Sequence, residues 1–209
     1  MKKLLILIFS LFFLISPAVF ADDISDFEIE GISIGDSLLD YMTEEEILEE
    51  IELNINDYYY LNEPYKYVEI YLRKDFPTYS FVSFFIKNNS TNKYLTNKNE
   101  KYIILSPRGY IRYVEEFESC IQKRDEIVEI FSDMFPREPK WEDIFSKNDD
   151  PSGKSIRDAV YFFIGEGDTH VEVSCSNYEE TFRIKNSLSE GLSVIVRPEE
   201  INNWLIDHK

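Results

Sequence analysis

Residues 157–176 read RDAVYFFIGEGDTHVEVSCS, and this stretch decides the fold. The four residues at 165–168, GEGD, separate a largely apolar run at 157–164 from a run at 169–176 in which valines alternate with polar residues. Apolar and β-branched residues on both sides of a short glycine-containing connection are typical of a β-hairpin. The stretch therefore predicts two antiparallel strands joined by a tight turn, with an antiparallel sheet around them.

The rest of the chain adds strands and helices to this hairpin. Apolar residues recur at spacings of three and four over 114–135, which predicts a long amphipathic helix ended by Pro136. A Thr-Glu-Glu-Glu box at 43–46 begins an acidic helix, and Pro198 begins a last one. Alternating or continuous apolar runs predict further strands at 65–72, 79–87, 102–106, 110–113 and 191–197.

These elements predict the fold class. We expect an α+β domain in which a mostly antiparallel sheet carries the long helix and shorter terminal helices packed on one face. Two segments are interpreted as connections. Pro107-Arg108-Gly109 has the composition of a turn, and the polar segment 136–155 is expected to supply only a short turn at Trp141 and Phe145.

The two cysteines lie on different predicted elements, Cys120 on the apolar stripe of the long helix and Cys175 in the second hairpin strand. Two cysteines in an exported chain most simply pair. A Cys120–Cys175 disulfide would tie the helix to the sheet and, by closing a loop of about 56 residues, stabilise the fold by roughly 4 kcal/mol. The alternative is a redox or nucleophilic thiol. It has little support, because only Lys123 and Arg124 supply cations within a turn of Cys120.

The N-terminal segment predicts export. A basic start at residues 2–3 precedes an apolar run at 4–16, LLILIFSLFFLIS, and small residues follow at Val19 and Ala21. This is the layout of a secretory signal peptide cleaved after Ala21. An uncleaved anchor is the alternative, but a helix over this run would cover roughly 20 Å of a ~30 Å hydrocarbon core. We therefore expect a signal peptide at 1–21 and a periplasmic or secreted location.

The composition argues against several classes of partner. The chain carries 22 Lys+Arg against 40 Asp+Glu, a formal net charge of −18 at pH 7. Such a chain lacks the basic stripe that binds nucleic acid or anionic lipid. Aromatic residues make up 15% of the chain, which argues against disorder. Residues 22–209 are expected to form one domain, with no stable membrane insertion after signal cleavage.

Residues 35–38, GDSL, match the nucleophile block of GDSL-type serine hydrolases. In that family a buried parallel strand precedes the serine, and a late Asp-x-x-His block supplies the base. Here glutamates interrupt the preceding segment, and neither His170 nor His208 follows an aspartate at that spacing. A serine without a placed base is not activated at neutral pH. We interpret the block as a turn capped by Asp36 or Ser37, with a hydrolase that uses Ser37 as the alternative.

Other patterns that suggest a ligand are incomplete. The GKS at 153–155 matches the end of a P-loop, but Asn148 stands where its first glycine belongs. Residues 148–152 offer oxygen ligands for calcium, but the closing glutamate is missing. Two histidines and two paired cysteines make zinc improbable. We therefore predict no metal site, no cofactor and no catalytic residue, and we interpret the acidic clusters as solvated faces.

Tyrosines are dense between residues 58 and 71. On a strand at 65–72, Tyr65, Tyr67 and Tyr71 share one face because side chains alternate. Two interpretations stay open. The ring-bearing face is either half-buried packing under a helix or loop, or a contact surface for a partner or a glycan.

The segment FEIEGISIGDSLLDY at 27–41, followed by the Thr-capped acidic helix, resembles the opening of a family of small exported bacterial proteins with no known activity. The similarity continues in ESCIQKRDEIVEIF, in SGKS followed by VYFFI and VEVSC, and in EEINNWL. The two cysteines sit where that family carries them. The resemblance implies export, a single α+β domain and the Cys120–Cys175 pair, but no chemistry. We therefore expect a soluble exported acidic domain that is not an enzyme and binds an unknown protein or small ligand.

Overall fold

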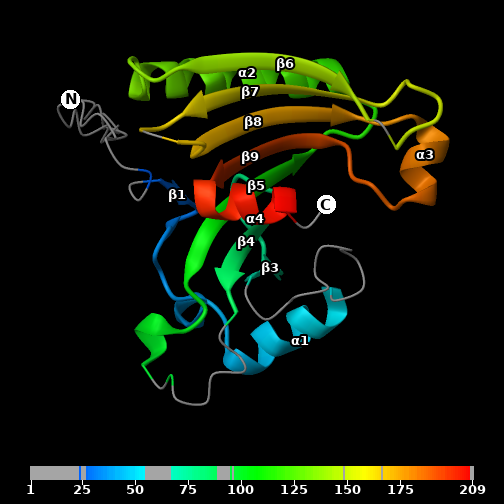
Figure 1. The fold of residues 1–209 in the computed structure, drawn as a ribbon. Coiled ribbons are helices and arrows are strands. Elements are labelled where there is room, and N and C mark those ends of the chain that lie inside the picture. The colour runs from blue at the N-terminus through cyan, green and yellow to red at the C-terminus, as the bar shows by residue number, and fades with distance from the viewer. Residues whose placement is uncertain are drawn as a thin grey trace, which may run out of the picture.

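The computed structural model describes residues 24, 27–54, 67–88, 95, 97–147, 149–165 and 167–207. A seven-stranded antiparallel sheet runs through its centre in the order β3-β4-β5-β9-β8-β7-β6 (Figure 1). A separate two-stranded hairpin consists of β1 (Glu28–Ile29) and β2 (Ile32–Ser33). The strands of the large sheet are β3 (Tyr67–Leu72), β4 (Phe81–Lys87), β5 (Ile104–Arg112), β6 (Lys140–Ser146), β7 (Ile156–Phe163), β8 (His170–Asn177) and β9 (Gly191–Arg197).

Four α-helices accompany the sheet in the described part of the chain. They are α1 (Glu44–Asn54), α2 (Phe117–Met134), α3 (Glu180–Lys185) and α4 (Glu199–Asp207). The predicted α+β class with a mostly antiparallel sheet and one long helix is confirmed. Among the residues described, no helix combines the length and the apolar character needed to cross a membrane.

The hairpin predicted from residues 157–176 is confirmed as β7 and β8. Their register runs from Ile156 opposite Asn177 to Phe163 opposite His170. The turn between them contains Gly165 and Gly167 at φ of 68° and 89°, a left-handed conformation that glycine adopts without strain. The N-terminal box of α1 is confirmed as well. The N–H of Thr43 donates to Glu46 Oε2 at 2.8 Å, and the N–H of Glu46 donates to Thr43 Oγ1 at 3.3 Å.

The long helix α2 covers one face of β7, β8 and β9, and this face is apolar. Its strand residues include Phe162, Val171, Val173, Leu192, Val194 and Val196, all buried. Alternation along each strand puts these side chains on the same side, where Cys120 and Phe131 of α2 meet them. The predicted disulfide between Cys120 and Cys175 is confirmed, and both residues are buried. We call this face the closed face.

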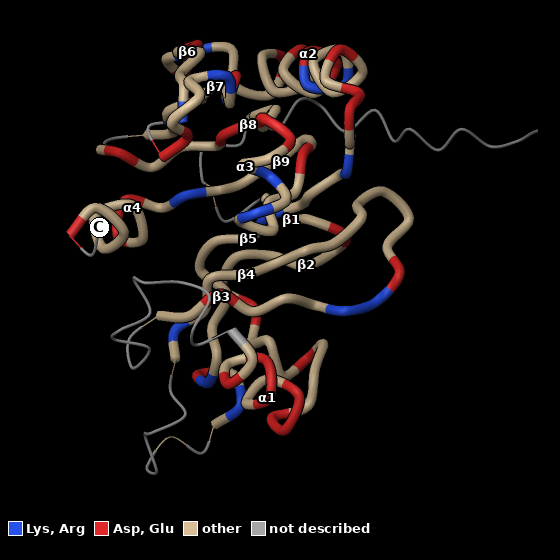
Figure 2. Tube along the Cα trace, turned by 90° about the vertical axis from the view of Figure 1, so that its right-hand side faces the viewer, with Lys and Arg blue, Asp and Glu red and all other residues tan. Residues whose placement is uncertain are grey.

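The C-terminal helix α4 lies on the opposite side of the sheet from α2 (Figures 1 and 2). Its Trp204 ring packs against Tyr67 of β3 and Phe85 of β4, with ring centroids 5.3 Å and 6.3 Å away. The helices are therefore divided between the two faces, whereas the sequence pattern placed them on one. An apolar stripe shows that a helix packs against something, but it carries no information on which side of the sheet it packs.

Two strand boundaries differ from the sequence prediction. The turn expected at Pro107-Arg108-Gly109 is wrong, because β5 runs unbroken from Ile104 to Arg112. Pairing with β9 begins only at Arg108, so the N–H that Pro107 lacks is not needed on that side. The short turn expected within 136–155 is also wrong for 140–146, which forms the edge strand β6. Its residues are nearly all exposed, and an exposed edge strand has little of the apolar alternation that identifies strands.

The disulfide predicts a specific loss of stability. The two cysteines are 55 residues apart, so replacing both with serine frees a long loop in the unfolded chain. We expect the C120S/C175S variant to lose about 4 kcal/mol of unfolding free energy. Urea denaturation of the oxidised protein and the variant measures this difference. The oxidised native protein should also show no thiol that reacts with Ellman's reagent. Two reactive thiols would show that the Cys120–Cys175 disulfide does not form.

Candidate functional site

The serine of the GDSL block is a structural residue in its observed setting. Ser37 is 4% exposed and precedes the 3-10 turn Leu38–Asp40. Its Oγ donates to the carbonyl of Lys101 at 2.8 Å and accepts from the N–H of Leu39 at 3.3 Å. A nucleophilic serine must give its proton to a base, and a backbone carbonyl is not one. The hydroxyl therefore acts as the cap predicted from the sequence.

His170, the histidine within the described residues, does not supply that base. His170 is buried on β8, where its Nδ1 lies 2.8 Å from the carbonyl oxygen of Asp168 and its ring contacts Tyr161 and Phe163. Burial lowers the pKa of this imidazole, and the charge of Arg197 lowers it further. His208 lies outside the described residues.

The loop that suggested calcium or phosphate uses its carboxylate internally. Asp150 is buried, and its carboxylate accepts from Ser152 N at 2.8 Å, Ser152 Oγ at 2.7 Å and Ser155 N at 2.9 Å. These hydrogen bonds hold the pKa of Asp150 far below its usual range despite the opposing effect of burial. Within the described ranges, no group of three metal-binding side chains forms. Asn148, the remaining residue of the pattern, lies outside them.

The feature that stands out is the second face of the sheet, which we call the polar face. Since side chains alternate, the residues between the apolar positions of β3, β4, β5, β8 and β9 all point away from α2. Many of them are polar and buried. They are Glu69, Ser83, Ser106, Glu172, Ser174 and Ser193. Polar side chains in buried strand positions need partners, and they find them across the strands.

Cross-strand bonds on the polar face join charged and hydroxyl groups. Ser83 Oγ donates to Glu69 Oε1 at 2.7 Å, and Arg108 Nε donates to Ser193 Oγ at 3.0 Å. On the other half of the face, Arg157 forms an ion pair with Glu172 and also bonds Ser174. The polar face thus carries two groups of cross-strand bonds, one over β3, β4, β5 and β9 and one over β7 and β8.

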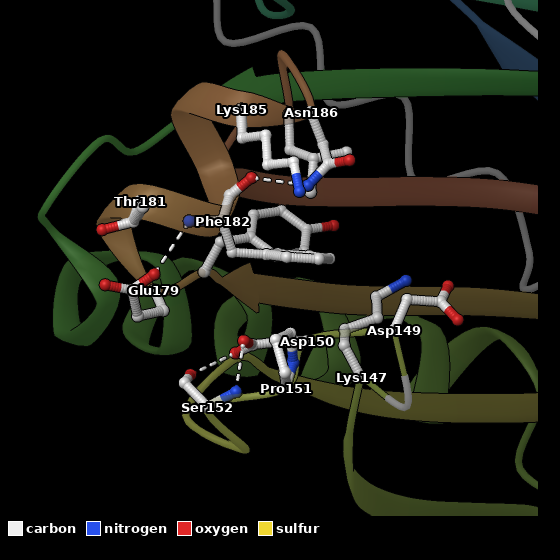
Figure 3. A pocket seen from close by; sticks show the side chains of 12 residues that line it. Lys147, Asp149, Asp150, Pro151, Ser152, Glu179, Thr181, Phe182, Lys185 and Asn186 are labelled. Carbon is white, nitrogen blue, oxygen red and sulfur yellow. Dashed lines mark hydrogen bonds between the residues drawn. The ribbon is translucent and has the colours of Figure 1, made fainter.

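A hollow of about 640 Å³ lies at one end of this face, between α3 and the loop that joins β6 to β7 (Figure 3). We call it the α3 hollow. The rings of Tyr178 and Phe182 lie in it, 6.4 Å apart between centroids. Its lining consists of Lys147, Asp149, Asp150, Pro151, Ser152, Tyr178, Glu179, Thr181, Phe182, Lys185, Asn186 and Leu188.

Two of the three carboxylates around the α3 hollow are already engaged. Asp150 holds its own loop, and Glu179 caps α3 by accepting from the N–H of Phe182 at 2.8 Å. The hydrogen bonds from the backbone lower the pKa of Glu179. Lys147 lies with its Nζ 5.9 Å from the centre of the Tyr178 ring, and Lys185 is exposed at the rim. The hollow therefore offers aromatic surface with ammonium groups at its edge.

A smaller hollow of about 250 Å³ lies on the same side of the sheet beside α4. It is lined mainly by aromatic rings, with two aspartates and an amide among them. The residues are Trp141, Asp143, Tyr161, Phe163, Asp168, His170 and Asn202. Trp141 is 60% exposed, so this hollow is open to solvent.

The tyrosine-rich segment is only partly within the described structure. Residues 55–66, with Tyr58, Tyr59, Tyr60 and Tyr65, lie outside it. Tyr67 is buried under α4, where its hydroxyl donates to Glu200. Tyr71 is half-buried and lies against Phe81, with centroids 5.7 Å apart. For these two rings the packing interpretation is the one the geometry supports.

Sequence reasoning missed the residues of the polar face. The signal was present as serines and glutamates that alternate with valines in VEVSCS at 171–176 and GLSVIVR at 191–197. No family model, curated protein or solved structure matches the chain. The resemblance to a family of exported bacterial proteins therefore stays a prediction. The candidate site is supported by the geometry of the described residues alone.

The setting of Ser37 predicts a structural phenotype. In the S37A variant the N–H of Leu39 and the carbonyl of Lys101 lose a partner, so we expect a loss of about 1 kcal/mol in unfolding free energy. Esterase activity toward p-nitrophenyl acetate should be equally absent from the parent protein and from S37A. Labelling of Ser37 by a fluorophosphonate in the native protein would contradict this assignment.

The carboxylate of Asp150 predicts a pH dependence of stability. Its pKa is lower in the folded chain than the ~3.9 of an unfolded aspartate. Its contribution is therefore complete above about pH 4 and is lost as the pH falls through the folded-state pKa. We expect D150N to be less stable than the parent at pH 7 and to lose less stability on acidification. Urea titrations from pH 7 to pH 2 measure this, with the exposed neighbour variant D149N as the control. A profile for D150N that parallels the parent would contradict the prediction.

Proposed function

We propose that this chain is an exported, soluble and non-catalytic binding domain that holds a small ligand in the α3 hollow. The export part is supported by the signal-like segment at 1–21 and by the buried Cys120–Cys175 disulfide, a bond that forms and persists in oxidising compartments. On this proposal the domain acts in the periplasm or outside the cell.

The non-catalytic part of the proposal is supported by the bonds that already engage the reactive side chains. Ser37 donates to a carbonyl, Asp150 holds a loop, and the two cysteines are joined. The hydrolase that the GDSL block suggests would need the hydroxyl of Ser37 to reach a base, which its hydrogen bond to Lys101 opposes. We therefore rank binding above hydrolysis.

The α3 hollow is the observation that carries the binding proposal. It lies within the usual size range of small-molecule sites and combines an aromatic surface with a few polar groups, as such sites do. The ring of Phe182 comes from α3 and that of Tyr178 from the segment between β8 and α3. The cap by Glu179 fixes the first turn of α3, from which Phe182 projects, and β8 positions Tyr178.

A ligand screen tests this proposal. We expect at least one class in a panel of hexoses, amino acids, dicarboxylates and nucleotides to raise the Tm of the parent protein, because a ligand that binds only the folded state stabilises it. The F182A variant should lose this shift. The I184A variant should keep it, because Ile184 lies on the same helix but is exposed outside the hollow.

The protein for this screen should be produced with its own N-terminal segment in a secreting host. We expect a mature mass that begins at Asp22, and a mass that begins at Met1 would contradict export. A panel without any stabilising compound, or a shift that F182A retains, would overturn the α3 hollow as the site.

A further inference from the structure

The smaller hollow beside α4 differs in character from the α3 hollow, and we call it the α4 hollow. Its volume is about 250 Å³. It lies toward the turn that joins β7 to β8, whereas α3 follows the far end of β8 (Figure 1). The two hollows therefore lie toward opposite ends of the same strands, and they share no described lining residue.

Strand register gathers the aromatic rings of the α4 hollow. Trp141 of β6 lies opposite Tyr161 of β7, and Phe163 of β7 lies opposite His170 of β8. Opposed residues of an antiparallel pair point to the same side of the sheet, so all four rings face the side that carries α4. The ring centroids of Tyr161 and Phe163 lie 5.6 Å and 5.7 Å from that of His170. Since His170 is buried and Trp141 is 60% exposed, the rings form a wall that opens outward.

The α4 hollow carries negative charge beside these rings. Asp143 is two residues from Trp141 on β6, so its side chain lies on the same side of the sheet. Asp168 lies in the turn just before β8, and both aspartates are exposed. In the described part of the chain, neither carboxylate forms a hydrogen bond or an ion pair, and Asp168 offers His170 only its backbone carbonyl. Both carboxylates are therefore available to a ligand.

The other groups around the α4 hollow do not neutralise this charge. The lining residues within the described ranges include no lysine or arginine. Burial lowers the pKa of His170, so its imidazole is uncharged at neutral pH, and Asn202 of α4 is neutral. Arg197 lies opposite His170 at the end of β9 but is not among these lining residues. Even when its charge is counted, two carboxylates outnumber one guanidinium.

Aromatic rings next to carboxylates match the chemistry of an organic cation. The face of an aromatic ring attracts a cation that lies within about 6 Å of its centre. An ionised carboxylate accepts hydrogen bonds and donates none, so it favours a positively charged partner. A quaternary ammonium group has no N–H, so it packs against rings without leaving a donor unsatisfied. The net charge of −18 on the whole chain favours the approach of a cation as well.

We propose that the α4 hollow binds a small organic cation, whose alkylated ammonium group lies against Trp141 and Tyr161 and whose charge is balanced by Asp143 and Asp168. Asn202 supplies an amide that can bind a hydroxyl or carbonyl group elsewhere on the ligand. This site goes beyond the function proposed for the α3 hollow, because it lies elsewhere on the polar face and uses different residues.

Calorimetric titration with choline, at low ionic strength and pH 7, tests the site. The control ligand is 3,3-dimethyl-1-butanol, which has the shape of choline with a carbon in place of the charged nitrogen. W141L removes the exposed ring but keeps an apolar side chain. D143N removes one charge from the hollow. E142Q is its matched control, because it removes one charge from the neighbouring residue, whose side chain lies on the other side of β6.

We expect choline to bind the parent and E142Q equally, and to bind W141L and D143N about fivefold more weakly. The neutral isostere should bind the parent about tenfold more weakly than choline. F182A should bind choline as the parent does, because Phe182 lines the α3 hollow instead. If choline does not bind, if the isostere binds as tightly, or if D143N and E142Q behave alike, the cation site is wrong. The ligand screen with F182A still tests the proposed function by itself.

A measurement on the parent protein covers the case in which a variant fails to fold. The chain has two tryptophans, the exposed Trp141 and the buried Trp204. Their indole N–H groups should give two signals in two-dimensional NMR, and that of Trp141 should exchange faster with water because its side chain is exposed. The Trp141 signal should shift as choline is added, while the Trp204 signal stays in place. An unchanged Trp141 signal at high choline concentration would contradict the proposal.

Discussion

The two-residue alternation of β8 and β9 is the constraint on which the rest of the structure depends. One set of side chains, with Val173 and Val194 in it, turns toward α2 and becomes the closed face. The other set, with Ser174 and Ser193, turns away and becomes the polar face. A shift of one residue in the pairing would bury the serines under α2 and put the valines in their place. The disulfide from Cys175 to α2 fixes which set faces the helix.

Much of the fold could be predicted from sequence because its signals are local. The hairpin follows from a glycine-containing turn between apolar runs, and the cap of α1 follows from Thr43 and Glu46. Cys120 and Cys175 form a pair that was predictable because only two cysteines exist. The side of the sheet on which α4 packs was not predictable, since it depends on Tyr67 and Phe85 meeting Trp204 across long sequence separations. The edge strand β6 was missed because exposure on both faces removes its pattern.

The candidate site was harder to predict than the fold, for a physical reason. A GDSL or GKS block is contiguous and therefore visible, yet Ser37 caps a turn, and Ser155 is fully buried and accepts from the N–H of Glu179. The arginines of the polar face are separated by about 40 residues or more in sequence and meet only through register. Short sequence motifs thus identified turns. The buried charged residues of the polar face are brought together by strand register, which no local sequence pattern encodes.

The edge position of β6 also bears on how copies of the molecule behave when crowded together. Its outer N–H and C=O groups are not paired by any strand in the described part of the chain, and Ile144 beside them is 66% exposed. Such an edge is a template for intermolecular ladders. Here, however, antiparallel self-pairing centred on Asp143 would set that carboxylate against its own twin, with Glu142 next to it. At neutral pH this repulsion disfavours the pairing of two β6 edges in that register.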